Sequence, residues 1–412
     1  MKRFPAFKTI LLAACVALFT AACHHHDDPE PDPVEPVAQQ TLLMYMPWSG
    51  GGSIYNACLK NISAMKTAIE YRRGLGSKRV VVLVASTANR AYLIDLKYKD
   101  GVCRYDTLKT YSYLSSKDYT TESGVKALFS DVISLAEAHS YGMVVSAHGT
   151  GWLPAQATSF LSKQQTMTGW RAPRRRMMPV DHPIETRYYG TGIGGDDAFH
   201  AEIAVLRDAV AATFGHLDFL LFDNCYMQNI EVAYDLRNIT DYIIGSTSEV
   251  MMIGMPFTTV GGHLLDGDYA AVVQDFYDFF IDYQDPYGTL SLVKTSEVEP
   301  MAALMKEANL RCDASKVDVY DVQALDGFSP SVFYDMGSYL KRLSNDNADL
   351  QSRLQAQLRK MVPTAVSTPL VYAEKTKSVF EVTEFSGITI SDISMARAAD
   401  QKTQTAWWQA TH

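Results

Sequence analysis

The chain has 412 residues, of which 47% are hydrophobic and 20% are charged, and its formal net charge is -9. This composition is typical of a globular protein with ample material for a core, and the length allows one large α/β domain or two modest ones. The acidic balance argues against nucleic acid as a partner, because surfaces that bind nucleic acid carry clusters of positive charge.

Residues 1–23 have the features of a secretory signal, with a basic start, an apolar stretch over residues 10–20 and two alanines before Cys23. Small residues directly before a cysteine resemble the bacterial lipobox, in which that cysteine is lipidated after cleavage. Cys15 also follows small residues, but cleavage there would leave too short an apolar core, so we expect lipidation at Cys23. The alternatives are a plain secreted protein and a transmembrane helix, although the apolar run is too short to span a bilayer.

Residues 24–40 are predicted to form an acidic, proline-rich tether that follows the anchor. They contain almost no apolar side chains, so they cannot offset the entropy lost on ordering. Three histidines at residues 24–26 could bind a metal ion, but we interpret them as the tip of the linker. The sequence therefore predicts an exported protein that is lipid-anchored in the bacterial cell envelope, at the outer membrane or the cell surface.

Removal of leader and anchor leaves four cysteines, at positions 58, 103, 225 and 312. They show neither close pairing nor the spacing of a metal site. An exported chain permits disulfides, and the pairing among Cys58, Cys103 and Cys312 stays open. Cys225 is the one placed like a reactive thiol.

Strand-like runs rich in Val, Ile, Leu and Phe alternate with helical patterns in the first two thirds of the chain. Strands are expected at residues 41–47, 79–86, 142–148, 217–225 and 241–246. Helices are expected at residues 55–73, 122–139, 197–214 and 228–236. Residues 91–113 alternate enough to form a small hairpin at one edge. The alternation of strand and helix predicts a mostly parallel central sheet that is covered on both faces.

Residues 150–196 break this pattern with glycines, prolines and a basic cluster, and a loop of that length in a compact fold is usually functional or disordered. The cluster consists of Arg171, Arg174, Arg175 and Arg176. Beyond the first sheet, helices are expected at residues 268–283, 300–310, 334–343 and 350–361, and strands at residues 289–295, 378–382 and 388–390. The folded part is therefore divided into a main domain at residues 41–300 and a C-terminal extension at residues 301–412 that packs on it.

Two of the predicted strands end on a pair of residues suited to thiol catalysis. His148 follows the run at 142–148 and Cys225 follows the run at 217–225, and the carboxyl ends of parallel strands are where such sheets bind ligands. A helix starting just after Cys225 is expected to lower the pKa of its thiol. His148 would take the thiol proton and Cys225 would attack a carbonyl, with the backbone N–H groups of Gly149 and Cys225 forming an oxyanion hole. The alternative is a small buried cysteine and a histidine satisfied within a turn.

Asp223 lies two residues before Cys225, so both side chains are expected on the same face of the strand. A carboxylate beside the nucleophile opposes thiolate formation. It could hold a cationic side chain of the substrate next to the reacting carbonyl. The other interpretation is a carboxylate that caps the following turn or helix, and the spacing alone does not separate the two.

The segments around these residues resemble the clostripain family of cysteine peptidases. The matching stretches are residues 43–46, 145–152, 222–227, 230–237 and 405–408, so the resemblance covers the chain from about Thr41 to its end. It implies a three-layer α/β/α caspase-like sandwich with a mostly parallel sheet and a C-terminal extension. It also implies a dyad of His148 and Cys225, cleavage after Arg or Lys, and Asp223 as the substrate-binding acid.

Other properties of the family concern a second acid, self-processing and calcium. Members often carry a further acid about thirty residues after the cysteine, where this chain has residues Gly254 to Phe257, so strict specificity for basic residues does not follow. Some members cut themselves between His and Cys, which makes Arg171, Arg174, Arg175 and Arg176 candidate sites within the loop at residues 154–190. A solvated basic loop is the alternative. Several members depend on Ca²⁺, but no contiguous loop of oxygen ligands is present, and no other cofactor is indicated.

The leading hypothesis is an envelope-anchored cysteine endopeptidase that acts on peptide or protein substrates and prefers Arg or Lys before the scissile bond. A second hypothesis is a catalytically silent, lipid-anchored module on the same fold that holds peptides or glycans. A third keeps the enzyme but assigns Asp223 to an internal contact, which would leave a pocket for neutral residues.

Overall fold

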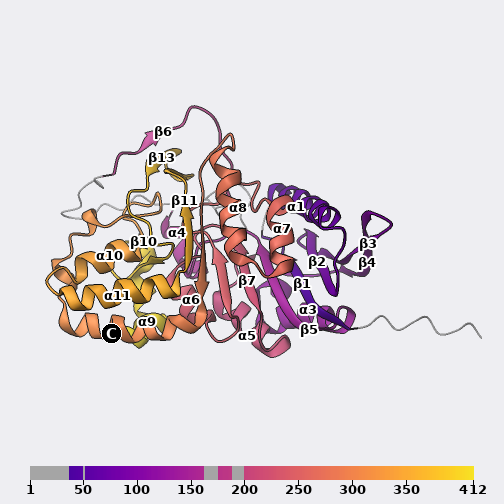
Figure 1. Cartoon of the computed structure of the whole chain (residues 1–412), viewed down its shortest axis with the longest axis horizontal. Helices are drawn as coiled ribbons and strands as arrows, with labels where there is room; N and C mark the ends of the chain where they lie inside the picture. Colours follow the sequence, from indigo (N-terminus) through magenta and orange to yellow (C-terminus); the bar gives the residue numbers. More distant parts are fainter. Residues whose placement is uncertain (1–36, 50–51, 162–174, 188–198) are drawn as a thin grey trace, which may run out of the picture. The chain divides into compact units, whose positions relative to one another are not determined.

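The computed structural model describes residues 37–49, 52–161, 175–187 and 199–412 (Figure 1). Residues Val37–His412 form one compact unit. The predicted signal and Cys23 lie outside the described residues, whereas the end of the predicted tether already belongs to a strand, β1 (Ala38–Met46). That strand begins early because its first residues pair with strands on both sides: Gln40 is opposite Lys78 and Ser140.

The described residues form a central sheet of nine strands in the order β11-β9-β8-β7-β5-β1-β2-β3-β4. The middle of the sheet is parallel, and antiparallel strands extend both edges, so the sheet is mixed in the way that large α/β sheets often are. The strands other than β1 are β2 (Lys78–Thr87), β3 (Arg90–Lys99), β4 (Val102–Ser112), β5 (Ala138–Ser146), β7 (Phe219–Asp223), β8 (Tyr242–Gly245), β9 (Thr289–Lys294) and β11 (Thr364–Ser367).

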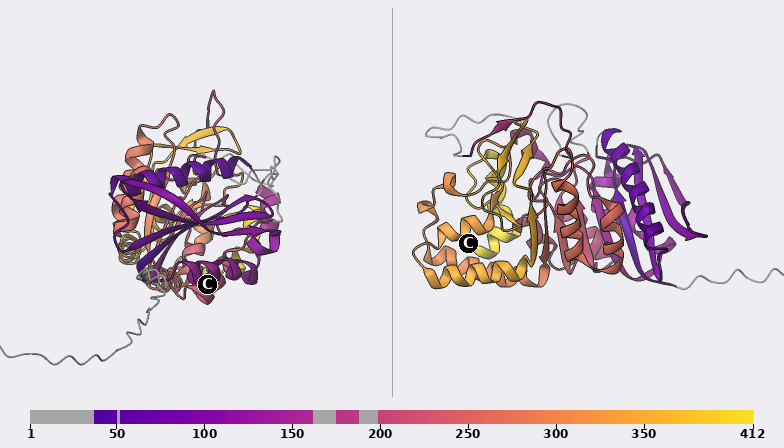
Figure 2. Two further views of the ribbon diagram at one scale, coloured as in Figure 1. Left: turned by 90° about the vertical axis from the view of Figure 1, so that its right-hand side faces the viewer. Right: turned by 45° about the horizontal axis from the view of Figure 1, so that its top comes forward.

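Helices cover both faces of this sheet (Figure 2), which confirms the predicted sandwich. Along β1, Leu42 and Met44 face one apolar cluster while Leu43 and Tyr45 face another, as expected for a strand with alternating side chains. The first cluster is covered by α1 (Gly52–Tyr71), α7 (Phe257–Asp266) and α8 (Tyr269–Ile281). The second is covered by α3 (Glu122–Leu135), α5 (Ile203–Thr213), α6 (Ile230–Leu236) and α9 (Val298–Arg311).

The part of the chain after residue 300 is built around α9 and three further helices, and it also supplies the edge strand β11. Its helices are α10 (Met336–Leu343), α11 (Ala348–Met361) and α12 (Ala406–Thr411). Two small sheets accompany them, one of β10 (Tyr334–Asp335) with β14 (Thr389–Ile390), the other of β12 (Leu370–Ala373), β13 (Ser378–Glu381) and β6 (Met178–Pro179). Since β11 extends the main sheet, the predicted division near residue 300 stays a proposal about organisation.

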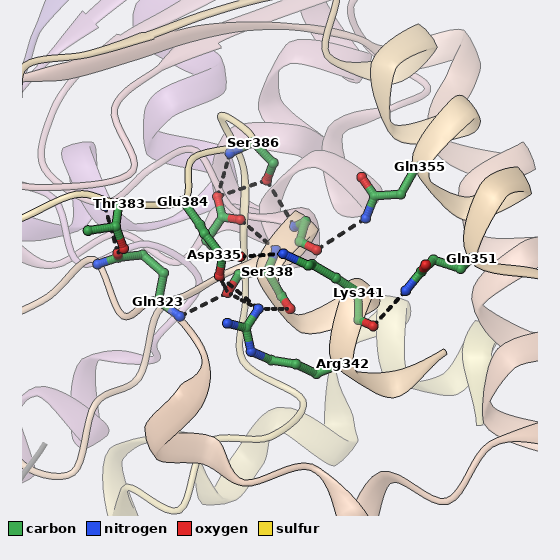
Figure 3. A network of polar contacts seen from close by, with 11 residues as sticks. Gln323, Asp335, Ser338, Lys341, Arg342, Gln351, Gln355, Thr383, Glu384 and Ser386 are labelled. Atoms are coloured by element: carbon green, nitrogen blue, oxygen red, sulfur yellow. Dashed lines mark hydrogen bonds and ion pairs between the residues drawn. The ribbon is translucent and has the colours of Figure 1, made fainter. Parts of the chain in front are cut away.

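A polar network fixes the start of α10 against the loop after β13 (Figure 3). The Asp335 carboxylate accepts hydrogen bonds from the backbone N–H groups of Ser338 at 2.8 Å and Ser386 at 2.6 Å. Glu384 accepts from the guanidinium of Arg342 at 2.7 Å. Asp335 thus caps α10 and at the same time joins it to a segment about fifty residues later in the chain.

Element boundaries differ from the expected ones where a cap or a new strand ends a helical pattern. The helix expected at residues 122–139 ends at Leu135, because β5 begins at Ala138. The helix expected at 228–236 begins at Ile230, because Asn229 caps it by accepting a hydrogen bond from Val232 N at 3.0 Å. Helix α7 was not predicted, and neither were the short helices α2 (Ser116–Thr120) and α4 (Ala155–Leu161). Within the described residues, no helix combines the length and the apolar character needed to cross a bilayer.

Candidate active site

The structure brings His148 and Cys225 to the same edge of the sheet. Strands β5 and β7 are parallel neighbours, and their last paired residues are Ser146 and Asp223. His148 and Cys225 each follow two residues after these. The side-chain amide of Asn224 donates a hydrogen bond to the His148 carbonyl at 2.9 Å. A methyl group added to Gly149 would lie 2.5 Å from the Cys225 carbonyl oxygen, so the two loops are in direct contact. These contacts require glycine at position 149.

The Cys225 thiol is completely buried. Its sulfur accepts a hydrogen bond from the Val250 N–H at 3.2 Å. Burial raises the pKa of the Cys225 thiol well above its usual value, and the nearby Glu249 carboxylate raises it further. The expectation of a lowered thiol pKa is therefore wrong for this state of the chain, since α6 begins only at Ile230 and its positive end does not outweigh burial.

The His148 imidazole faces a segment of the chain that precedes Cys225 by about forty residues. Its Nδ1 lies 2.9 Å from the carbonyl oxygen of Arg187. Because a carbonyl only accepts hydrogen bonds, Nδ1 carries the proton in this contact. Burial lowers the pKa of His148 and outweighs the hydrogen bond to the Arg187 carbonyl, which raises it. The Arg187 charge lowers the pKa further, so a neutral imidazole is favoured.

The Arg187 side chain is fully buried in a pocket in which each of its five N–H groups has an acceptor. Nε donates to the Met252 carbonyl at 3.3 Å. Nη1 donates to the Asp223 carboxylate at 2.5 Å and to the Asp223 carbonyl at 3.1 Å. Nη2 donates to the Asn61 side-chain oxygen at 2.6 Å and to the Ile253 carbonyl at 3.3 Å. The pocket is therefore complementary to a guanidinium group.

Asp223 is the anionic group of this pocket. Its carboxylate also accepts hydrogen bonds from the Ser146 hydroxyl at 2.9 Å and from the Met255 N–H at 3.0 Å. Burial raises the pKa of Asp223, and the Arg187 charge together with these donors opposes that rise by stabilising the carboxylate. The helix that follows Cys225 is capped by Asn229, so Asp223 does not cap it.

The segment that carries Arg187 lies against residues 250–252 as an added antiparallel strand. Arg187 N donates to the Val250 carbonyl at 2.8 Å, and Met252 N donates to the Glu185 carbonyl at 2.9 Å. Thr186 is paired with Met251 between these two bonds. Peptide substrates commonly bind enzymes in this mode, in which backbone hydrogen bonds fix the register and pockets read alternate side chains.

Comparison with known proteins places the chain in a family. The sequence profile of the clostripain family matches residues 186–409. A secreted C11 cysteine protease from Bacteroides thetaiotaomicron, iotapain, is 34% identical, with a TM-score of 0.80 over 92% of this chain and 100% of that one. The chain belongs to the clostripain family. This clostripain-family protein is therefore a cysteine-type endopeptidase with the caspase-like fold of its relatives.

Two other solved structures resemble this clostripain-family peptidase. An inactive zymogen of a C11 protease from Parabacteroides distasonis is 25% identical, with a TM-score of 0.73 over 92% of this chain and 100% of that one. A clostripain from B. thetaiotaomicron ATCC 29148 in complex with the peptide inhibitor BTN-VLTK-AOMK is 38% identical, with a TM-score of 0.51 over 54% of this chain and 98% of that one. No curated protein matches the chain.

The remaining predicted site residues are the arginines of the basic cluster. The Arg175 guanidinium packs over the Phe380 ring at 4.4 Å, and its Nη2 donates to the Ser331 hydroxyl at 3.3 Å, whereas Arg176 is exposed. Arg171 and Arg174 lie outside the described residues. The predictions for self-cleavage did not include Arg187. A single basic residue in an irregular loop gives no periodic signal, and Asn61 is indistinguishable in the sequence from other polar positions of α1.

The described residues contain neither a cluster of metal ligands nor a disulfide. Among the described residues, no group of three or more His, Cys, Asp or Glu side chains is placed to hold a metal ion. The four described cysteines are free thiols. Cys58 and Cys103 are buried in the core and Cys312 is half-buried.

Gly254 offers a steric test of the Arg187 pocket. It has a positive φ of 70°, and an added methyl group would lie 2.0 Å from Arg187 Nη2 and 2.7 Å from the Asp223 carboxylate. We expect Gly254→Ala to slow cleavage after arginine by roughly tenfold to a hundredfold, because the methyl group overfills the pocket. The measurement is the time course of cutting of the purified chain and of an arginyl peptide.

Gly262→Ala is the matched control for this prediction. Gly262 lies in α7, where an added methyl group meets nothing within 4 Å. It should leave the cleavage rate unchanged. Equal rates for Gly254→Ala and the wild-type chain would show that the pocket around Arg187 does not receive the substrate side chain.

Proposed function

We propose that this peptidase hydrolyses the bond after an arginine residue, using Cys225 as nucleophile and His148 as general acid and base, and that its first substrate is its own Arg187–Tyr188 bond. One observation carries the proposal. The Arg187 guanidinium has an acceptor for every N–H group while the carbonyl of the same residue lies 2.9 Å from His148 Nδ1. The chain thus presents itself to the site in the manner of a substrate.

The chemistry follows from these positions. His148 accepts the Cys225 proton as the sulfur attacks the carbonyl carbon, and a C–S bond forms. The backbone N–H groups of Gly149 and Cys225, which the contact between their loops brings together, stabilise the oxyanion. The imidazolium then protonates the leaving amine as the C–N bond breaks. Water, with His148 as base, releases the acyl group and restores the thiol.

Arginine is preferred to lysine because of the number and arrangement of the acceptors. A lysine ammonium has three N–H groups and no planar fork, so it would leave some of the five buried acceptors unpaired. The peptide inhibitor bound to one relative, BTN-VLTK-AOMK, has lysine as its last residue. The proposal therefore includes cleavage after lysine as well as after arginine. The missing second acid is compensated here by Asn61 and by the carbonyls of Met252 and Ile253.

Asp223→Asn tests whether the Asp223 carboxylate recognises the basic side chain of the substrate. Loss of the carboxylate leaves the guanidinium without a counter-charge in a buried site, so kcat/KM for arginyl peptides is expected to fall by an amount equivalent to about 2 to 5 kcal/mol. Turnover of peptides with a neutral residue at that position should change much less. The experiment profiles a peptide library with the processed protein and its variant.

A matched control is Asp95→Asn, which removes a buried carboxylate from another ion pair, at 2.8 Å from the half-buried Arg79 on β2. This variant should lose stability and keep the arginine preference. An unchanged preference in Asp223→Asn would instead favour a pocket for neutral residues, and absence of all peptide cleavage by the wild-type chain would favour the silent binding module.

Export and anchoring belong to the same proposal. The signal over residues 1–23, lipidation at Cys23 and an acidic tether would place the folded unit at the outer membrane or cell surface, and iotapain is described as secreted. Cys23→Ser should move the protein from the membrane fraction to the soluble fraction of the producing cells. A membrane-bound Cys23→Ser variant would rule out the lipid anchor.

A further inference from the structure

A buried carboxylate lies beside the residue that precedes Arg187. Glu249 is 1% exposed and immediately precedes Val250, whose N–H contacts the Cys225 sulfur. Its Oε2 accepts a hydrogen bond from the Thr186 hydroxyl at 2.8 Å. Its Oε1 accepts from the Tyr226 hydroxyl and from the Glu374 N–H, both at 2.9 Å. Glu249 is therefore held by two groups of the scaffold and one group of the inserted segment.

The backbone pairing fixes which substrate residue meets Glu249. The bonds from Arg187 N to Val250 O and from Met252 N to Glu185 O set the register of the inserted strand. A peptide substrate can pair with residues 250–252 in the same register and place its arginine in the pocket that holds Arg187. The residue before that arginine then lies where Thr186 lies. Successive side chains of a strand point to opposite faces, so this residue is read separately from the arginine.

We propose that Glu249 is a specificity-determining residue that selects serine or threonine directly before the arginine of the substrate. The inference rests on the proposed function, since it assumes that Thr186-Arg187 occupies the site as a substrate would. In the processed enzyme, the hydroxyl of the incoming residue takes the place of the Thr186 hydroxyl on Glu249 Oε2. The substrate class is thus a peptide with a hydroxyl side chain followed by a basic side chain.

A hydroxyl suits this carboxyl group better than a methyl group or a cation does. Burial raises the pKa of Glu249 to about 8, so near neutral pH the group occurs in both its protonated and its ionised form. A hydroxyl can donate to the ionised form and accept from the protonated one. The methyl group of valine can do neither, and it would leave a buried polar atom without a partner. A cationic side chain is matched only by the ionised form.

The experiment compares two peptides that differ only in having a hydroxyl group or a methyl group at one position. One carries Thr-Arg and the other Val-Arg before the scissile bond, and threonine and valine have nearly the same shape. With the processed wild-type protein, kcat/KM is expected to favour the threonine peptide by roughly tenfold or more, since a site that pairs a substrate hydroxyl rejects the analogue without it. In Glu249→Ala the ratio should fall to about one.

Self-cleavage provides a second measurement that does not require a Glu249 variant to fold. Thr186→Val should slow cutting of the chain after Arg187, while Thr186→Ser, which keeps the hydroxyl, should restore most of the rate. Equal turnover of the threonine and valine peptides by the wild-type protein overturns this inference and leaves the proposed function standing. Failure to cleave any arginyl peptide overturns the proposed function itself, so the two outcomes are distinguishable.

Discussion

Replacement of Cys225 by alanine is expected to abolish both the cutting of the chain after Arg187 and the cleavage of arginyl peptides. Cys225 is the proposed nucleophile, and removal of a nucleophile typically lowers kcat by about 10⁴-fold or more. The fold should persist, since the change removes one buried sulfur atom. The measurements are intact mass after prolonged incubation, peptide turnover and thermal unfolding.

Cys103→Ala is the matched control for this experiment. Cys103 is also a buried free thiol, but it lies on β4 at the far edge of the sheet. Its variant should lose a similar amount of stability and retain full activity. Turnover by Cys225→Ala equal to that of the wild-type protein would discard Cys225 as nucleophile, whatever the geometry around His148.

The environment of Cys225 explains why its thiol is unreactive in this structure. Cys225 is fully buried and accepts a hydrogen bond from the Val250 N–H, and burial together with Glu249 raises the pKa of its thiol. A thiol held in its protonated form is a poor nucleophile. Under the proposed function, this state is the precursor, in which the chain's own Arg187 fills the pocket around Asp223.

The sequence allowed the sheet and the approach of His148 to Cys225 to be predicted, because both depend on local patterns. The buried runs of β5 and β7 contain mainly Val, Leu, Phe and Met, and such runs indicate parallel strands. Once adjacent parallel strands are assumed, their carboxyl ends place His148 and Cys225 together. The edge strand β11 was missed because it has four half-buried residues and no strong pattern.

The pocket could not be predicted because its parts come from distant segments without a shared signal. Asn61 comes from α1, and the carbonyls of Met252 and Ile253 come from an irregular turn. Helix α7 was missed because it contains adjacent glycines; Gly261 allows close packing on Met65 of α1. The raised pKa of Cys225 has a similar origin, since its burial and the nearby Glu249 carboxylate depend on the tertiary fold.

Arg187→Ala is expected to leave the chain uncut and less stable. The substitution removes the cation that pairs with Asp223 in a site where both side chains are fully buried, and breaking such a pair typically costs about 3 to 5 kcal/mol. The wild-type protein should yield a fragment that begins at Tyr188, and the variant should yield none. Arg187→Lys should be cut slowly, because lysine satisfies fewer of the five acceptors.

The same experiment separates Arg187 from the basic cluster that the sequence suggested. Arg176 is exposed, so Arg176→Ala removes a basic residue of the same segment without disturbing a buried contact. The Arg176→Ala variant should still be cut before Tyr188. A variant in which Arg171 and Arg174 are also replaced by alanine should be cut there too. Arg175 is omitted from this control because its guanidinium packs on Phe380. Cutting that persists in Arg187→Ala, or a new N-terminus within the cluster, would assign processing to the cluster and would mean that Arg187 fills the pocket only as an inhibitor.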